Sequence, residues 1–349
     1  MKVRIKDIAR LAQVSPGTVD RVLHNRGGVS EKTRQKIEEI MKEMHFEKDI
    51  LASSLAMRRS YLFAVILPVC ANDSEYWDAP EKGIGKALDE IGHYGVRIKT
   101  YRFDQYNKDS FIGKTNELLA DKPDAVLLAP IFVKEASEFI ESCHQQKIPV
   151  ALFNNNLEGI DKISYIGQDG YKSGVLGAKL LSLGMNNNGD ILILNIAGRQ
   201  ENQTHLVNRE RGFRSFFNEH PDLEFNFHTV DFHQPKKDEF FTKLDKVFKK
   251  ARIKGIFVTN SRVYKAAEYL EEKNINDVRI VGYDLIPRNI QYLKDDKISF
   301  LISQKPEEQG YHGIMTLFRN IFLKKEVEKE QYLSIDILTK ENIDYYEYK

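Results

Sequence analysis

Cysteine is nearly absent from this chain of 349 residues, which contains only Cys70 and Cys143. The two lie far apart, without a CxxC pair or a histidine at zinc-ligand spacing, which argues against a disulfide framework and a zinc knuckle. We expect both to be core thiols. No stretch approaches the ~18 apolar residues of a membrane span, and no apolar signal-peptide segment follows Met1. The sequence therefore predicts a cytoplasmic protein without a membrane partner.

Enzyme signatures are also missing. The segment GIGKAL around Gly83 lacks the full GxxxxGK[ST] phosphate loop, and Leu88 stands where a GxGxxG motif needs its third glycine. None of the nine histidines belongs to an HExxH motif, and no known pairing of nucleophile and base occurs. We therefore expect no enzymatic activity, no catalytic residues, no metal and no cofactor.

Net charge is small for the chain as a whole, whose formal value is +1. Its distribution is uneven, because residues 1–59 contain 13 Lys and Arg against 8 Asp and Glu. The resulting local charge of +5 leaves −4 for the other residues. The basic excess lies at the N-terminus.

Residues 1–45 carry the pattern of three short helices. The middle one, in the stretch VSPGTVDRVLHNRGG, begins at the N-cap Ser15 with Pro16 in its first turn and ends at a glycine pair. The apolar stripes that we expect to face inward are Ile5, Ile8, Leu11 and Ala12 in the first helix, Val19, Val22 and Leu23 in the second, and Ile37, Ile40, Met41 and Met44 in the third, which Ser30 caps.

Two short helices joined by a tight turn form the helix-turn-helix arrangement, whose second helix lies in the DNA major groove. The small Pro16 and Gly17 allow close approach to base edges, and Arg21 can reach a guanine or a phosphate. The alternative is a purely structural three-helix bundle, and for Asp20 an intrahelical pair with His24 competes with base readout. The candidate DNA contacts are Ser15, Pro16, Gly17, Thr18, Asp20, Arg21 and Asn25.

The next segment, KDILASSLAMRRS, is apolar over only about nine residues. A helix that short is marginal in water, so we expect it to order only on a partner. The adjacent Arg58 and Arg59 indicate that the partner is the phosphate backbone of DNA.

From Tyr61 onward, strand-like and helix-like segments alternate in two sets. The first includes LFAVILPV, VRIKTY, DAVLLA and IPVALF, and the second includes DILILNI, GIFVT and RIVGY. Such alternation predicts parallel sheets covered by helices, here in two α/β lobes. Ligands bind these sheets at the carboxyl ends of the strands.

Together, IKDIARLAQVSPGTVDRVLHNRGGVSEKTRQKI, the ILASSLA segment and the two lobes resemble the lactose-repressor (LacI/GalR) family over essentially the whole chain. The resemblance implies an all-α helix-turn-helix head in residues 1–46, a hinge helix in 47–60 and a two-lobed domain like periplasmic sugar-binding proteins in 61–349. We expect lobe 1 to comprise residues 61–162 and 287–322, and lobe 2 residues 163–286 and 323–349. It further implies that the hinge enters the minor groove as a dimer, with Leu55 wedged into a base step beside Ala56; the alternative for Leu55 is helix packing alone.

Several residues after expected strands or at helix starts resemble the family's ligand contacts. Carboxylate, amide and guanidinium groups that converge at strand ends suit vicinal hydroxyls. Each also has a structural alternative: Asp169 as a helix cap, Asp284 as a turn residue, Phe232 as core. The candidates are Asp169, Arg209, Asn260, Asp284 and Gln304, with Asn154 in a loop and Tyr76, Trp77, Phe132 and Phe232 as an apolar wall.

The sequence therefore predicts a DNA-binding transcriptional regulator, most simply a repressor, gated by a sugar or polyol bound between the lobes. The helix-turn-helix head predicts binding to pseudo-palindromic operator DNA as a homodimer. We expect a dimer rather than a tetramer because the ending ENIDYYEYK lacks the leucine heptads of a tetramer tail. The alternatives are a nucleobase-responsive or protein-gated regulator of the same fold, and a cytoplasmic sugar-binding or sugar-modifying protein.

Overall fold

The computed structural model describes residues 4–23, 27–44, 60–69, 75–185, 188–196 and 204–347. The chain divides into two compact units, Met1–Arg59 and Ser60–Lys349. Of the sequence predictions, Asn25, Leu55, Ala56, Cys70 and the hinge segment up to residue 59 lie outside the described residues. Within the described part, no helix has the length and apolar character needed to cross a membrane.

The first unit contains the three predicted helices, α1 (Ile5–Ala12), α2 (Pro16–Leu23) and α3 (Glu31–Glu43). Gln13 takes a left-handed conformation in the turn between the first two, with φ of 58°. The core consists of Ile8, Ala9, Ala12, Val19, Val22 and Ile37. Leu11 was assigned wrongly, because it is 47% exposed and Ala9 takes the buried place.

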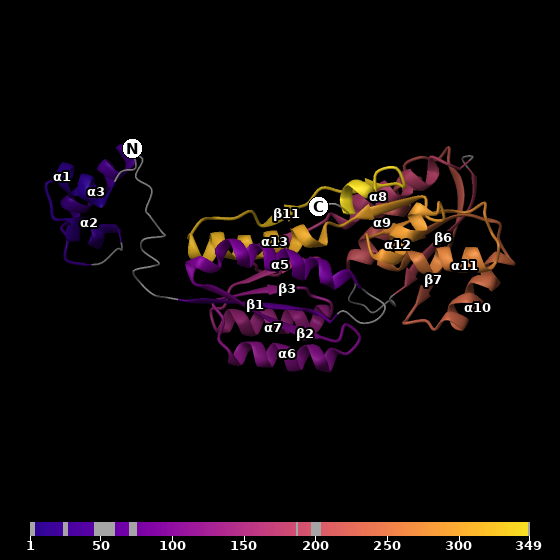
Figure 1. Cartoon of the computed structure of the whole chain (residues 1–349), viewed down its shortest axis with the longest axis horizontal. Helices are drawn as coiled ribbons and strands as arrows, with labels where there is room; N and C mark the ends of the chain where they lie inside the picture. The colour runs from indigo at the N-terminus through magenta and orange to yellow at the C-terminus, as the bar shows by residue number, and fades with distance from the viewer. Residues whose placement is uncertain are drawn as a thin grey trace. The chain divides into compact units, whose positions relative to one another are not determined.

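Lobe 1 is built on a six-stranded parallel sheet in the order β11-β5-β4-β3-β1-β2. Its fully buried strands are apolar runs, as expected of a sheet covered on both faces. Helices α5 and α13 lie side by side over one face, and α6 and α7 cover the other (Figure 1). The strands are β1 (Tyr61–Pro68), β2 (Val96–Phe103), β3 (Ala125–Leu128), β4 (Val150–Phe153), β5 (Tyr165–Gly167) and β11 (Glu330–Tyr332); the helices are η1 (Glu75–Trp77), α5 (Asp78–Ile91), η2 (Gly92–Tyr94), α6 (Lys108–Ala120), α7 (Val133–Gln145), α13 (Pro306–Leu317) and η4 (Phe318–Phe322).

Lobe 2 has a second six-stranded sheet in the order β12-β10-β9-β8-β6-β7, parallel except for the β10–β12 pair. One apolar core lies under α8 and α9, and the other under α10, α11 and α12. The strands are β6 (Asn188–Ile196), β7 (Glu224–Phe232), β8 (Ile253–Val258), β9 (Arg279–Tyr283), β10 (Phe300–Ser303) and β12 (Asp336–Leu338); the helices are α8 (Gly170–Ser182), α9 (Thr204–Asn218), α10 (Lys237–Phe248), η3 (Ser261–Val263), α11 (Tyr264–Glu272), α12 (Pro287–Lys294) and α14 (Asp344–Glu347).

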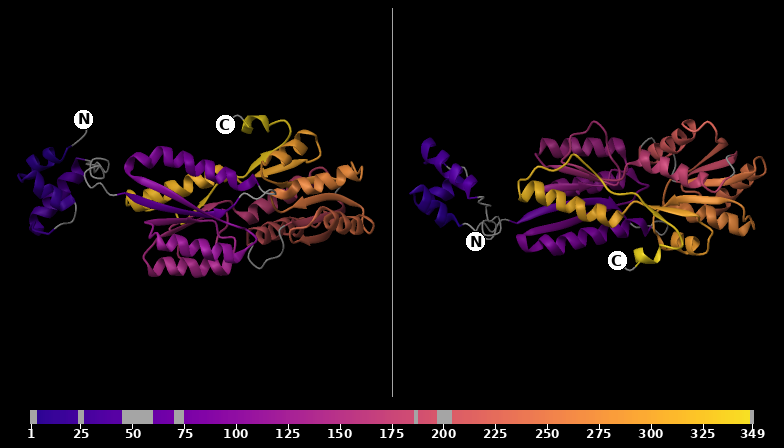
Figure 2. Two further views of the ribbon diagram at one scale, coloured as in Figure 1. Left: turned by 60° about the horizontal axis from the view of Figure 1, so that its bottom comes forward. Right: turned by 90° about the horizontal axis from the view of Figure 1, so that it is seen from above.

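The chain crosses between the lobes three times: from β5 to α8, from β10 to α13, and from β11 to β12. The last crossing carries the C-terminal segment, drawn yellow, from lobe 1 to lobe 2 (Figure 2). The predicted lobe boundaries were therefore wrong in three places. β5, which was predicted in lobe 2, belongs to lobe 1 through its pairing with β4. Residues 287–303 belong to lobe 2, because α12 packs there and β10 pairs with β9, whereas β11 belongs to lobe 1 through its pairing with β5.

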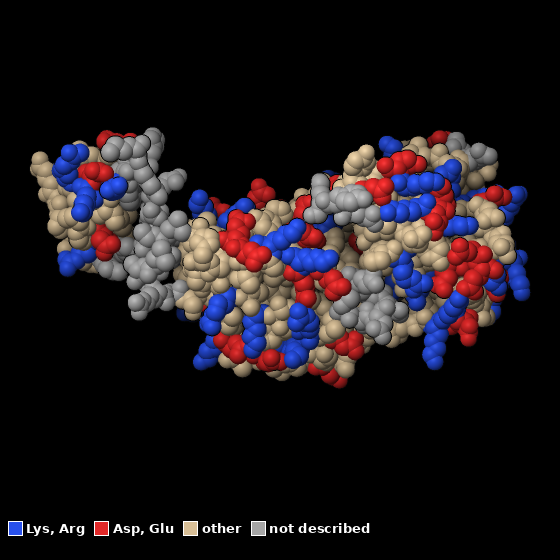
Figure 3. Space-filling view, in the orientation of Figure 1, with Lys and Arg blue, Asp and Glu red and all other residues tan. Residues whose placement is uncertain are grey.

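Opposite charges are mixed on the surface of the two-lobed domain. On the face shown in Figure 3, Lys and Arg side chains alternate with Asp and Glu side chains over both lobes. This pattern agrees with the near-neutral charge of the chain beyond residue 59. Cys143 is buried in lobe 1, as predicted, and burial raises the pKa of its thiol to about 12.

Candidate functional site

A pocket opens between the two lobes at the carboxyl ends of their strands. Including its opening to solvent, the space is about 580 Å³, of which about 70 Å³ can hold the centres of water-sized molecules. Seven of the sequence candidates lie on its wall, drawn from both lobes. The lining residues are Tyr76, Trp77, Gln105, Tyr106, Ile131, Asn154, Leu206, Arg209, Asn260, Ser261, Arg262, Asp284 and Gln304.

Asp284 is the buried carboxyl group of the pocket. It follows β9 with a φ of 74°, a left-handed conformation that Asp and Asn tolerate better than most residues. Both carboxylate oxygens accept from Gln304 Nε2, at 2.9 and 2.7 Å. Burial raises the pKa of Asp284 to about 7, while Arg209 and the Gln304 hydrogen bonds oppose that rise. The carboxyl group can therefore change its charge near neutral pH.

Arg209 projects from α9 and is 2% exposed. Its guanidinium donates to the Thr259 carbonyl at 2.7 Å and to Gln304 Oε1, and lies 3.9 Å from the centre of the Tyr283 ring. Helix α9 approaches α8 closely, because any side chain at Gly174 would collide with the main chain of Arg209. The main chain of Arg209 is therefore held in place by packing, and among the described residues its buried Nε has no hydrogen-bond partner.

Asn260 and Arg262 follow β8 at the start of η3. Asn260 Nδ2 donates to the Ile196 carbonyl at 3.0 Å, and its Oδ1 accepts from the Arg262 amide at 3.1 Å. The Arg262 guanidinium donates to the same Ile196 carbonyl at 3.1 Å and to the Tyr106 hydroxyl of lobe 1. Arg262 thus bridges the two lobes across the pocket.

Lobe 1 supplies an aromatic wall. Tyr76 and Trp77 meet edge to face at 5.0 Å, and Trp77 packs likewise on Phe153 at 6.3 Å. The Tyr76 hydroxyl accepts from Asn154 Nδ2 at 2.6 Å, so its own proton remains for another acceptor. Burial raises the pKa of Tyr76 well above its ordinary value, which keeps that proton in place. Asn154 is left-handed like Asp284, with φ of 68°.

Three sequence candidates lie elsewhere. Phe132 packs in the core of lobe 1 against Phe103 and Phe111, and Phe232 packs in lobe 2 at 4.6 Å from Phe240. Both are absent from the pocket wall, because aromatic residues at strand ends also fill the space under the next helix. Asp169 caps α8 by accepting from the Lys172 amide at 3.0 Å. The observed contacts are therefore those of core side chains for Phe132 and Phe232 and of a helix cap for Asp169.

Six lining residues were not among the sequence candidates: Gln105, Tyr106, Ile131, Leu206, Ser261 and Arg262. Gln105 and Tyr106 follow β2, so the same strand-end rule that found Asp284 also pointed to them. Arg262 lies two residues beyond Asn260, and the sequence contained no further signal for it.

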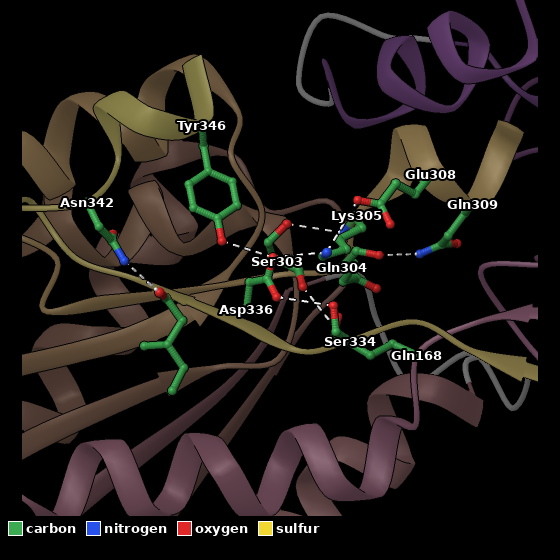
Figure 4. Close-up of polar contacts among 11 residues, drawn as sticks. Gln168, Ser303, Gln304, Lys305, Glu308, Gln309, Ser334, Asp336, Asn342 and Tyr346 are labelled. Carbon is green, nitrogen blue, oxygen red and sulfur yellow. Dashed lines mark hydrogen bonds and ion pairs between the residues drawn. The ribbon is translucent and has the colours of Figure 1, made fainter. Parts of the chain in front are cut away.

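One amide joins the three crossings beside the pocket. Gln168 Nε2 donates to the Ser303 carbonyl at 2.9 Å and to the Ser334 carbonyl at 3.3 Å, as Figure 4 shows. Lys305 Nζ lies 3.2 Å from Asp336 Oδ2, and this carboxylate oxygen also accepts from the Tyr346 hydroxyl at 3.0 Å. The crossings are therefore tied together by side chains.

In the N-terminal unit, the predicted DNA-contact face is exposed. The Ser15 hydroxyl caps α2 by accepting from the Thr18 amide at 3.1 Å. Pro16, Gly17 and Arg21 are exposed on that helix, while Thr18 and Asp20 are half-buried. Contact of these residues with DNA stays a prediction.

Comparison with known proteins identifies both units. Residues 4–49 match the family of bacterial regulatory proteins of the lacI family, and residues 63–325 match the periplasmic binding protein domain family. The sucrose operon repressor of Streptococcus mutans is 25% identical over 81% of this chain and 83% of its own length. The HTH-type transcriptional regulator DegA of Bacillus subtilis is 29% identical, over 63% of this chain and 62% of its own length.

Solved structures agree with this result. A protein of Bacteroides fragilis, described as a proposed LacI transcriptional regulator, is 31% identical over 82% of this chain and all of its own, with a TM-score of 0.77. A solute-binding protein of an ABC transporter from Agrobacterium vitis, bound to α-D-tagatopyranose, has a TM-score of 0.71 over 81% of this chain and 96% of its own. The latter is 20% identical and shows the shared fold only.

Proposed function

Because the chain belongs to the lacI family of bacterial DNA-binding transcriptional regulators, we propose that it represses operators in response to a sugar or polyol bound between its lobes. The sucrose operon repressor among its relatives supports a carbohydrate effector. We assign the protein no enzymatic step, and its DNA target implies that it acts in the cytoplasm.

The observation that carries this proposal is the joined set of Arg209, Asp284 and Gln304 on the pocket wall. A carboxylate accepts two hydroxyl protons and a guanidinium donates to two oxygens, so together they suit vicinal hydroxyl groups. Trp77 and Tyr76 offer an apolar surface for the C–H faces of a ring.

Asn154 and Trp77 come from lobe 1, whereas Asp284 and Arg209 come from lobe 2. A ligand that touches both sets binds more tightly to closed lobes than to open ones. It can shift DNA affinity only by the difference between its affinities for these two states. Couplings of this kind are typically ~1–3 kcal/mol.

We propose that the protein binds a pseudo-palindromic operator as a homodimer, with α2 in the major groove. Exposed Arg21 and Pro16 on that helix support this placement. The wedge role of Leu55 and the hinge contact of Ala56 remain predictions from the family resemblance.

The test measures sugar binding and operator binding on the full chain. Unfolding temperature is recorded against sugars, polyols and nucleobases, since a ligand of the native state raises it. Operator affinity is then compared with and without each hit. A sugar or polyol hit that changes operator affinity supports the proposal. A nucleobase hit alone, or an operator response only to a partner protein, contradicts it.

A further inference from the structure

Among the described residues that line the pocket, positive charge exceeds negative charge. Arg209 and Arg262 are both buried, at 2% and 8% exposure, and both lie on its wall. Among the described lining residues, Asp284 is the one carboxyl group. Two guanidinium groups therefore face one carboxyl group, and that carboxyl group is half neutralised near pH 7 because burial raises its pKa to about 7.

Within the part of the chain that the structure describes, neither guanidinium donates to a carboxylate. Arg209 donates to a main-chain carbonyl and to the amide oxygen of Gln304, and Arg262 donates to a main-chain carbonyl and to the Tyr106 hydroxyl. Buried charges in proteins are ordinarily paired with a charge of opposite sign. Two buried donors at the pocket, Arg209 Nε and Gln105 Nε2, also have no acceptor among the residues that the structure describes. The described part of the wall thus has unused donors and more positive charge than its own carboxyl group balances.

Arg262 also belongs to a second hollow. Together with Tyr106 it lines an adjoining space of about 810 Å³, counted with its open side, whose other walls are Asp104, Ile196, Gln234, Pro235 and Lys265. The carboxylate of Asp104 accepts from the Tyr106 main-chain amide at 2.9 Å, a hydrogen bond within the loop that follows β2. Arg262 therefore has the hydroxyl-binding groups on one side and room for a further substituent on the other.

We propose that the effector is an acidic sugar, whose hydroxyl groups bind at Asp284 and Asn260 and whose carboxylate or phosphate group binds at Arg262. The proposal rests on the proposed function of the same pocket. Arginine suits this role because its planar guanidinium binds carboxylate and phosphate oxygens in pairs. The acidic group would supply negative charge that the described side chains of the wall do not.

The test is calorimetric titration of the full chain with matched sets of ligands. Each set holds a neutral sugar, its uronate or aldonate, and its phosphate ester: for example glucose, glucuronate, gluconate and glucose 6-phosphate, with the corresponding galactose, fructose and ribose compounds. We expect at least one acidic member to bind about tenfold or more tightly than its neutral parent. Its affinity should fall with added NaCl, and that of the parent should not. The carboxylate and phosphate arms distinguish the two kinds of acid.

Arg262→Gln should reduce the preference for the acid at least about tenfold while neutral sugars still bind. Arg262→Lys keeps the positive charge but lacks the paired donors of a guanidinium. Its preference for the acid should therefore lie between those of the wild type and Arg262→Gln. The matched control is Arg252→Gln, which removes an exposed guanidinium just before the opposite end of β8 and should change nothing.

Equal affinity for acid and parent in every set overturns the acidic-effector proposal and leaves sugar gating standing. Retention of the full preference by Arg262→Gln, with its unfolding temperature near that of the wild type, also overturns it. If no neutral or acidic sugar binds, the proposed function fails and this proposal fails with it.

Discussion

Replacing Asp284 by asparagine should stabilise the two-lobed domain increasingly as the pH rises. The unfolded side chain ionises above its usual pKa of 3.8, whereas the folded one keeps its proton up to about 7. Between these values the folded state binds the extra proton, so the stability contributed by this group falls as the pH rises. At about 1.4 kcal/mol per pKa unit, the full loss is about 4 kcal/mol, and about 3 kcal/mol of it falls between pH 5 and pH 8.

The assay is urea unfolding of wild type and Asp284→Asn at pH 5 and pH 8. Trp77, the single tryptophan, is buried in lobe 1 and reports the unfolding of this domain by fluorescence. Comparing the two proteins at each pH cancels the carboxylates that both share. The stability of the variant relative to the wild type should increase by about 3 kcal/mol from pH 5 to pH 8. A constant or decreasing difference would refute the assignment of a neutral-range titration to Asp284.

Three further outcomes are expected. Arg21→Ala should weaken specific operator binding by about 1–3 kcal/mol if it reads a base edge, and an unchanged ratio of specific to random DNA binding would move Arg21 to the phosphate contacts. Asp169→Ala should lower stability by about 1 kcal/mol, because the cap of α8 is lost, and should keep the effector response. Asp284→Ala should abolish that response, and operator affinity measured with and without effector distinguishes the two variants. Gln168→Ala should destabilise the domain by about 1–3 kcal/mol in calorimetry, and a value near zero would show that its two hydrogen bonds do not hold the crossings.

The sequence predicted most of the buried strands but missed the shortest ones and β7, an edge strand of nine residues that are mostly half-buried. β1, β6 and β8 are buried parallel strands, and such strands appear as continuous apolar runs in the sequence. β5, β11 and β12 have only three residues each, which is too short for any periodicity. The lobe boundaries depend on those short strands, and this explains why β5 and β11 were assigned to the wrong lobe. Residues 287–303 were misplaced because the four-residue strand β10 was not predicted.

The strand-end rule predicted positions better than it predicted roles. It located Asn154, Asn260 and Asp284 because their place depends only on where parallel strands end. It failed for Phe132 and Phe232, since an aromatic side chain at a strand end can turn either to the cleft or to the core beneath a helix. That choice depends on the packing of distant residues, which no local pattern contains.

Gln304 connects the pocket between the lobes to the crossings. Its side chain binds both Asp284 and Arg209, and its main-chain carbonyl accepts from Gln309 of α13 at 2.7 Å. The preceding residue, Ser303, accepts from the Gln168 amide at the adjacent crossing. A ligand hydroxyl that donates to a carboxylate oxygen of Asp284 would join the same hydrogen-bonded set as the Gln304 amide, which belongs to the segment that links the lobes. Coupling between effector and lobe movement therefore needs no long pathway of contacts.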